Sequence, residues 1–337
     1  MALNDLTVVI LSRGREEILR NTLSFWSNKA VKVLVLHNTQ NPLAIRDIPD
    51  NVTYIVEKIS YGERCGLVPK YLKTSYAILS SDDEIFLPGG LNTMINELEK
   101  NHTLESIGGS AIAVGKYGPR TTGTYCYRNM EGYANLKRSA KSRLLEHFNP
   151  KMPWRGGAIY RVLSHELFTK MMKMFHEMSV FSTPYIFEVS GEILINSSGK
   201  TRYLTEIYWI RNWINEPVGH RSWDRGIYFN SWMTNSIYKQ EVCEWKDVLV
   251  KFVELNPEDL NQILENVLTL RFASESREIE RRSTFRIPLP TYIKYLLRKA
   301  TKTAMPKEIN ETLTDMENLG IKFSYHEVNE ALETIIP

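Results

Sequence analysis

Two short apolar runs near the start of the chain constrain its fold more than any other feature. Residues 7–12 (TVVILS) and 31–36 (VKVLVL) are rich in β-branched and aliphatic side chains, and residues 15–27 between them have helical periodicity. Nearly continuous apolar runs are typical of strands that are covered on both faces of a sheet. Strands that alternate with helices favour a parallel sheet, because a parallel connection needs a crossover long enough to hold a helix.

The same alternation continues along the chain. Further strands are expected at residues 52–56, 76–79, 107–114, 154–162 and 203–210, and further helices at 63–74, 91–100, 165–178, 187–196, 242–255 and 257–271. Residues 116–153 lack a clean period and are expected to form a partly helical insertion.

The pattern predicts an α/β fold with a mostly parallel sheet flanked by helices and a helical C-terminal extension. We place the α/β domain at residues 1–235 and the extension at 236–337. Ligands are expected at the carboxyl ends of such strands.

Charge and cysteine content exclude several classes of protein. The 42 basic and 39 acidic residues give a net charge of only +3, so nucleic acid is not the expected partner. The three cysteines, Cys65, Cys126 and Cys243, are far apart and match neither a metal-binding spacing nor a disulfide framework. The apolar runs are too short to span a bilayer. A cytoplasmic protein is therefore expected.

The most informative segment is residues 77–91 (AILSSDDEIFLPGGL), where a buried strand leads into adjacent carboxylates. Asp82, Asp83 and Glu84 follow the strand at the end where open α/β sheets bind ligands. Adjacent carboxylates repel one another unless they are solvated, cap a helix or bind a cation. A divalent ion shared with a diphosphate is one solution, and a solvated turn before the next helix is the other.

Four segments carry a resemblance to a known family. They are Ser12-Arg13-Gly14-Arg15 after the first strand, Val33–Thr39, Tyr61-Gly62-Glu63-Arg64, and the acidic segment with Ile85–Leu91 behind it. In this order they resemble the GT-A glycosyltransferases, specifically the family-2-like inverting enzymes that use nucleotide-diphosphate sugars. The resemblance extends over residues 1–115. It implies that this part is the nucleotide-binding half of the domain and that residues 116–235 are the acceptor and catalytic half. It also implies a GT-A fold and sugar transfer to a hydroxyl of a glycan or a lipid-linked acceptor.

The resemblance also implies where the donor binds. The residues expected to contact the nucleotide sugar are Ser12, Arg13, Asn38, Arg64 and Asp82. Arginine suits this role because its planar guanidinium can bind a phosphate at two points. A divalent cofactor, Mn²⁺ or Mg²⁺, is expected on the donor diphosphate, with Asp83, Glu84 and His220 as its ligands.

An inverting transfer also needs a carboxylate that accepts the proton of the acceptor hydroxyl. By resemblance Glu188 lies closest to the family's base position, and Glu192, one helical turn on, is the reserve candidate. A pair of solvated helix glutamates is the alternative. Trp154, Arg155 and Gly156 form an aromatic-bearing turn that is suited to the acceptor side.

Two further features leave alternatives open. The tryptophans between residues 209 and 245 are expected to be mostly core, with one or two facing the cleft. Residues 281–307 combine basic and aromatic side chains, which suits a peripheral contact with an anionic membrane. A packed helix with a solvated basic side is the favoured interpretation of that segment.

Three functions compete. A metal-dependent glycosyltransferase leads. Ser81 stands where the family usually has its first acid, and the family's Glu-Asp pair is missing near Glu188, so a catalytically silent protein that binds carbohydrate or a partner stays open. A nucleotidyltransferase ranks lower, because the first loop has one glycine and no lysine. Dinucleotide and P-loop enzymes are disfavoured, since neither glycine motif occurs.

Overall fold

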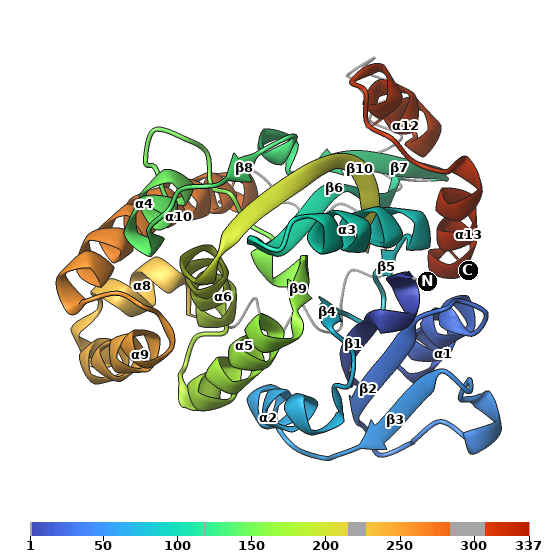
Figure 1. Cartoon of the computed structure of the whole chain (residues 1–337), viewed down its shortest axis with the longest axis horizontal. Helices are drawn as coiled ribbons and strands as arrows, with labels where there is room; N and C mark the ends of the chain where they lie inside the picture. The colour runs from blue at the N-terminus through green and yellow to red at the C-terminus, as the bar shows by residue number, and fades with distance from the viewer. Residues whose placement is uncertain (1, 118, 215–226, 284–306, 337) are drawn as a thin grey trace.

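The computed structural model describes residues 2–117, 119–214, 227–283 and 307–336. It is a mixed α/β molecule built around a ten-stranded sheet that is flanked by helices, and its C-terminal part is helical (Figure 1). The strands follow the order β3-β2-β1-β4-β9-β6-β10-β5, with β7 beside β6 and β8 beside β10. The predicted α/β class with a helical C-terminal part is confirmed.

The elements have the following bounds. The strands are β1 Leu6–Arg13, β2 Lys32–Asn38, β3 Val52–Val56, β4 Tyr76–Ser80, β5 Ile85–Phe86, β6 Leu104–Tyr117, β7 Arg120–Cys126, β8 Ala134–Asn135, β9 Val162–Ser164 and β10 Lys200–Asn212. The helices are α1 Glu16–Trp26, α2 Tyr61–Tyr71, α3 Pro88–Lys100, α4 Ala140–His147, α5 His165–Glu177, α6 Tyr185–Ser198, α8 Phe229–Thr234, α9 Lys239–Phe252, α10 Pro257–Ser283, α12 Ile309–Asn318 and α13 Tyr325–Ile335.

The N-terminal strands form the parallel part of the sheet, as predicted. β1 lies between β2 and β4, and Ile10 pairs with Val35 on one side and Ser80 on the other. Because the three strands run in the same direction, their carboxyl ends meet at one edge. That edge brings the β1–α1 connection, the end of β2 and the acidic turn after β4 together.

The remainder of the sheet is mixed. β9 is antiparallel to both β4 and β6, whereas β10 runs parallel to β6. The strand predicted at residues 154–162 is wrong: this stretch ends in a 3-10 turn, Ala158–Tyr160, and only Val162–Ser164 is extended. Gly157, with a φ of 88°, precedes this turn, and few other residues adopt this conformation without strain.

Residues 116–153 contain β7 and α4 as well as irregular chain. The sequence of β7, RTTGTYC, has few apolar residues, so its periodicity does not mark a strand. Its pairing with β6, from Ala111 opposite Cys126 to Tyr117 opposite Arg120, makes it one. Here tertiary pairing overrides a weak local signal.

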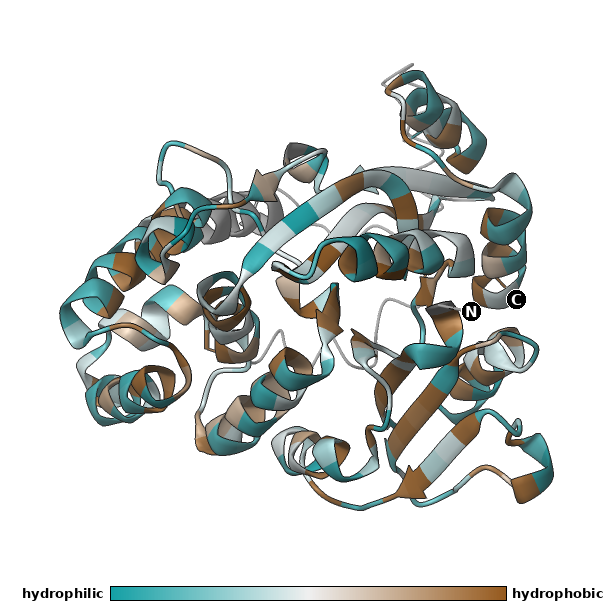
Figure 2. Cartoon of the chain, viewed as in Figure 1, coloured by the Kyte–Doolittle hydropathy of each residue, from teal (hydrophilic) through white to brown (hydrophobic). Residues whose placement is uncertain are grey.

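Two apolar cores lie on the two faces of the sheet. Val8 and Ile10 belong to the core that α1, α3, α12 and α13 cover, whereas Val9 belongs to the core that α2, α5 and α6 cover. Successive strand residues point to opposite faces, so a continuous apolar strand serves both cores. Figure 2 shows this in the hydrophobic colouring along the N-terminal strands, as the two apolar runs predict.

The helices after residue 235 divide between these cores. α9 and α10 pack on the second core, where Trp245 is fully buried. α12 and α13 return to the first core beside β7 and α1, and Figure 1 shows α13 close to the N-terminus. An ion pair of 2.6 Å between Lys29 Nζ and Glu330 Oε1 joins the two ends of the chain. The stretch predicted as one helical extension therefore covers two separate parts of the sheet.

Several predicted features fall on other parts of the chain. Residues 284–306, which hold most of the basic segment 281–307, lie outside the described residues, as does Trp223. Trp209, Trp232 and Trp245 are buried, in line with the expectation for most of this group. Among the helices that are described, none is both long enough and apolar enough to cross a membrane.

Candidate functional site

An open depression lies at the carboxyl ends of β1 and β2. Its volume is about 480 Å³, and its lining residues are Arg13, Gly14, Glu16, Asn38, Thr39, Gln40 and Asn41. Gly14 and Arg15 both have positive φ angles, 60° and 63°, so the chain turns sharply out of β1 into α1. Two of the residues predicted to bind the donor, Arg13 and Asn38, therefore share one polar surface.

Asn38 and its neighbour are tied into the edge of the sheet. Asn38 Nδ2 donates a hydrogen bond of 2.8 Å to the carbonyl of Ile59. His37 is buried, with Nδ1 2.7 Å from Tyr54 Oη and Nε2 3.1 Å from the carbonyl of Gly14. Burial lowers the pKa of His37, so the ring favours its neutral form here. The imidazole braces the turn that shapes the depression.

The acidic turn after β4 begins with Asp82, which faces the β1–α1 connection. Its carboxylate accepts a hydrogen bond of 2.6 Å from Ser12 Oγ and pairs with Arg15. Its carbonyl accepts another from Thr22 Oγ1 at 2.6 Å. Burial raises the pKa of Asp82, and the charge of Arg15 opposes that rise. Ser12 and Asp82, both predicted donor contacts, thus lie together and bind each other.

Asp83 is the most exposed of the three acids and shares the same arginine. It accepts a hydrogen bond of 2.9 Å from Ser81 Oγ, and Arg15 Nη2 lies 2.8 Å from its Oδ2. Burial acts to lower the pKa of Arg15, but Asp82 and Asp83 outweigh it and raise that pKa. Sequence reasoning did not predict that Arg15 pairs with these acids. The available signal is a cation directly after the first strand, since an acidic motif follows the neighbouring strand.

Glu84 points to the opposite side, towards β10. Its carboxylate accepts hydrogen bonds from Trp209 Nε1 at 3.1 Å and from Arg211 Nε at 3.2 Å. Arg211 also donates a hydrogen bond of 3.0 Å to Tyr127 Oη. Burial raises the pKa of Glu84, against the charge of Arg211. The three consecutive acids are therefore divided between Arg15, at the start of α1, and Arg211, in β10.

The acids expected to bind the divalent cation already have other partners in the described part of the chain. Asp82 and Glu84 point away from each other, and each already faces a guanidinium. Across the described part of the chain, no three His, Cys, Asp or Glu side chains gather closely enough to bind a metal ion. His220, the third expected ligand, lies outside the described residues. Asp83 is the acid of this motif that remains nearest to solvent.

Arg64, a further predicted donor contact, lies beneath the strand ends. Its Nη1 donates hydrogen bonds to the carbonyl of Ser12 and, at 3.1 Å, to that of Leu36. The side chain is buried, and this burial lowers the pKa of its guanidinium. Arg64 joins α2 to the ends of β1 and β2. A contact between Arg64 and phosphate stays a prediction.

Glu188 lies in the first turn of α6, with its side chain 34% exposed. Its Oε1 faces Gly156: a Cβ built on that glycine would lie 3.3 Å from Oε1 and 2.7 Å from Trp154 Nε1. The structure therefore brings together the predicted base and two of the three predicted acceptor residues. The lack of a side chain at Gly156 leaves room for this approach.

An aromatic wall connects Glu188 to the acidic turn. The ring of Tyr160 lies 4.5 Å from that of Trp209, and the ring of Tyr127 stacks on Trp209 at 5.9 Å. Burial raises the pKa of Tyr160, and the charges of Glu84, Glu188 and Asp83 all act on the same phenol. Gly156 faces Glu188 Oε1, and a Cβ built on the adjacent Gly157 would lie 3.3 Å from the ring of Tyr127. The base candidate therefore lies beside the same aromatic group as Glu84.

Two predicted site residues are in the interior. Glu192 is fully buried, and it accepts hydrogen bonds from the Ala158 backbone N–H at 2.6 Å and from His147 Nε2 at 3.0 Å. The guanidinium of Arg155 covers the ring of Tyr133 at 4.1 Å and donates to the carbonyl of Glu146. The predicted reserve base is thus a buried residue with two hydrogen-bond donors around it, and the predicted acceptor contact Arg155 packs on an aromatic ring.

Sequence reasoning also missed Arg271, which reaches the site from α10. Its Nη1 lies 3.4 Å from Glu188 Oε2, and its guanidinium lies over the rings of Trp154 and Tyr185 at 5.2 and 5.3 Å. The residue is 7% exposed. An arginine inside the mostly apolar stretch 263–272 (ILENVLTLRF) is the sequence signal that points to an internal partner.

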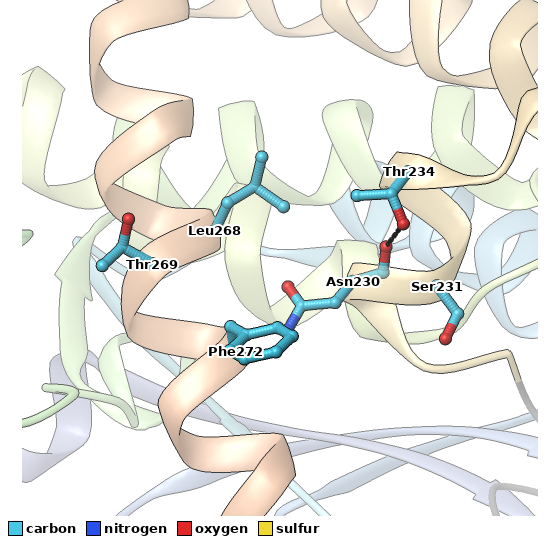
Figure 3. Close-up of a pocket in the computed structure, with 6 residues that line it drawn as sticks. All are labelled: Asn230, Ser231, Thr234, Leu268, Thr269 and Phe272. Atoms are coloured by element: carbon cyan, nitrogen blue, oxygen red, sulfur yellow. Dashed lines mark hydrogen bonds between the residues drawn. The ribbon is translucent and has the colours of Figure 1, made fainter.

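A second pocket opens beside the same helix (Figure 3). It has a volume of about 470 Å³ and is lined by Asn230, Ser231, Thr234, Leu268, Thr269 and Phe272. Figure 3 shows the Asn230 side chain directed towards the ring of Phe272, the residue that follows Arg271. The pocket thus combines an exposed aromatic ring with amide and hydroxyl groups.

Comparisons with known proteins give a likeness to solved structures only. No protein-family model matches the sequence, and no curated protein is significantly similar to it. A crystal structure of S. aureus TarS 1-349 is 11% identical, with 87% of this chain and 79% of that chain covered and a TM-score of 0.49. A second crystal structure of S. aureus TarS is 10% identical, with 74% and 42% covered and a TM-score of 0.44.

Proposed function

We propose that this protein is a glycosyltransferase that moves a sugar from a nucleotide-diphosphate sugar to a hydroxyl of a glycan or a lipid-linked acceptor. One observation carries the proposal. Glu188, a partly exposed carboxylate, faces Gly156, and the adjacent Gly157 lies against the ring of Tyr127. The hydroxyl of Tyr127 accepts a hydrogen bond from Arg211, which pairs with Glu84 of the acidic turn. A displacement between two substrates needs both a donor site at such an edge and a base beside it.

On the donor side, the depression at Arg13 and Asn38 suits a nucleotide. The carboxamide of Asn38 is already bound at its nitrogen, which leaves its oxygen as an acceptor for the edge of a base. Arg13 is exposed at the same surface and offers a cation to the diphosphate. The expected Mn²⁺ or Mg²⁺ remains a prediction, and no step below depends on it.

On the acceptor side, Glu188 is proposed as the general base. Its Oε1 accepts the proton of the acceptor hydroxyl, and the hydroxyl oxygen forms a bond to the anomeric carbon of the donor. The bond between that carbon and the diphosphate oxygen breaks, and the nucleoside diphosphate leaves with the electron pair. Attack in line with the leaving group inverts the anomeric centre. Trp154 beside Glu188 provides a flat apolar surface for the acceptor sugar.

The substitution Glu188→Gln tests the proposal. Donors are first found by thermal shift with a panel of nucleotide-diphosphate sugars, because a ligand that binds the native state raises its melting temperature. Sugar transfer and donor hydrolysis are then assayed with Mg²⁺, Mn²⁺ and a chelator. We expect the variant to bind the donor normally and to lose transfer by about 10²–10⁴-fold, the contribution typical of a general base.

Glu166→Gln is the matched control, because Glu166 also lies in the first turn of a helix, α5, and is exposed. Its transfer rate is expected to equal that of the unmodified protein. Transfer that survives Glu188→Gln would reject Glu188 as the base. Donor binding without turnover in the unmodified protein would instead identify a carbohydrate-binding protein that lacks catalysis.

A further inference from the structure

Arg271 is the point at which the C-terminal helices enter the candidate active site. It belongs to α10, yet its side chain is only 8% exposed and ends beside the carboxylate of α6. The distance from its Nη1 to Glu188 Oε2 is 3.4 Å. A buried cation beside a partly exposed carboxylate differs from a surface ion pair, because the protein rather than solvent sets its position.

Two aromatic rings define where the guanidinium lies. The rings of Trp154 and Tyr185 are 5.2 and 5.3 Å from its central carbon. Tyr185 in turn stacks on Tyr228 at 6.0 Å with an angle of 16° between the rings. Planar guanidinium groups pack well on aromatic faces, so these contacts restrict the rotamers of Arg271.

The two oxygens of Glu188 have different surroundings. Oε2 faces Arg271, and Oε1 faces Gly156 and Trp154. Tyr185 and Glu188 are three residues apart on α6, so one turn of this helix supplies both a ring and a carboxylate to the same guanidinium. An arginine on one oxygen therefore sets the direction of the other.

We infer that Arg271 is a positioning residue for Glu188: it holds Oε2 so that Oε1 faces the acceptor hydroxyl. This inference rests on the proposed glycosyltransferase function. A base acts efficiently only when it lies within hydrogen-bond reach of the proton that it accepts. It follows that α10, which lies outside the α/β domain predicted from the sequence, completes the catalytic site.

The test is a double-mutant cycle of Arg271→Gln and Glu188→Gln, with Arg271→Lys as the conservative variant. In the unmodified background, Arg271→Gln is expected to lower kcat about 10–100-fold with little change in the KM for the donor, since a misplaced catalytic group costs rate rather than donor binding. In the Glu188→Gln background it is expected to cause no further loss. Arg271→Lys retains the charge and is expected to recover part of the rate.

The matched control is Arg120→Gln, which breaks another arginine–glutamate pair, with Arg120 Nη1 3.3 Å from Glu308 Oε1. Its kcat is expected to be unchanged. A normal kcat for Arg271→Gln, or a loss that multiplies with that of Glu188→Gln, overturns the inference. If Arg271→Gln lowers the melting temperature, two results separate positioning from loss of fold. Partial recovery of kcat in Arg271→Lys and an unchanged KM for the donor support the inference, and their absence overturns it. Loss of transfer in Glu188→Gln alone leaves the proposed function intact, whereas retained transfer in that variant removes its basis.

Discussion

Single side chains decide how the acidic turn is used. Arg15 forms ion pairs with both Asp82 and Asp83, and Arg211 forms one with Glu84. A buried carboxylate is costly unless it is paired, so these arginines are part of the turn's stability. The consequence is that a motif expected to bind a cation is already supplied with cations by the protein itself.

The substitution Arg15→Gln is expected to destabilise the protein by about 1–3 kcal/mol at neutral pH, because it leaves Asp82 buried without its cation. Burial already raises the pKa of Asp82, and loss of Arg15 raises it further. A carboxyl group with a raised pKa favours the folded state at low pH and loses that contribution as the pH increases through the folded pKa. The destabilisation should therefore shrink between pH 7 and pH 4.5, as measured by urea unfolding.

Arg13→Gln serves as the control at the neighbouring position. Because Arg13 is exposed, the free energy of unfolding of this variant is expected to stay within about 0.5 kcal/mol of that of the unmodified protein at both pH values. An equal loss for Arg15→Gln at pH 7 and pH 4.5 would contradict the assigned pairing with Asp82.

At the scale of elements, the packing of α6 determines which of its two glutamates is accessible. The helix packs on the 3-10 turn Ala158–Tyr160, and a Cβ added to Gly191 would lie 2.2 Å from Ile159 Cγ2. This close approach places Glu192 against the Ala158 backbone N–H. It leaves Glu188, one turn earlier, at the open end beside Gly156.

Gly191→Ala should force α6 away from this turn. Overpacking of a well-packed contact costs about 1–3 kcal/mol, so a lower free energy of unfolding is expected, together with weaker transfer because Glu188 shifts with the helix. Chemical denaturation and the transfer assay measure the two effects.

Gly115→Ala in β6 is the comparison, since the nearest atom to a Cβ there, Thr122 Oγ1, is 3.4 Å away. We expect this variant to be as stable as the unmodified protein and as active. A Gly191→Ala variant that behaves in the same way would show that the contact with Ile159 is not tight in solution.

At the scale of the whole molecule, two cores on one sheet are closed by distant parts of the chain. α10 joins the second core and brings Arg271 to the site, while α13 returns to α1. The arrangement buries ionisable groups on both sides of the sheet. His37 is covered at the donor edge, and His147 is fully buried beside Glu192.

These two buried histidines are expected to make the free energy of unfolding depend on pH. Burial lowers the pKa of both His37 and His147 in the folded state, although Glu192 partly opposes this for His147. Groups with a depressed folded pKa contribute stability that is present above the unfolded pKa and is lost as the pH falls. The free energy of unfolding should thus decrease below about pH 6.5, by up to about 1.4 kcal/mol per pH unit for each histidine.

Urea unfolding at pH 7.5, 6.5 and 5.5 measures this slope. His37→Asn is expected to flatten it, since one of the two titrating groups is removed, whereas His326→Asn, at an exposed position of α13, should leave it unchanged. An unaltered slope in His37→Asn would mean that this ring takes up its proton equally in the folded and unfolded states.

The sequence predicts the elements of this molecule best where local and tertiary signals agree. β3 has the predicted bounds, and α3 ends at Lys100 as predicted but begins at Pro88, before the predicted start. β7 and the short β9 were not predictable in the same way. β7 has few apolar residues, and a 3-10 turn, Ala158–Tyr160, lies within the stretch 154–162 that was predicted as a strand. Strand pairing across the sheet decides both.

For the site, the sequence by itself determined that carboxylates follow β4 at the ligand-binding edge of an α/β sheet and that Glu188 begins a helix. Only the tertiary structure decided that Glu188 is partly exposed and Glu192 is buried. It also decided that Arg15 pairs with Asp83 and that Arg271 pairs with Glu188. The physical reason is that a residue's periodicity is local, whereas its burial and its ionic partners depend on which distant segment packs against it.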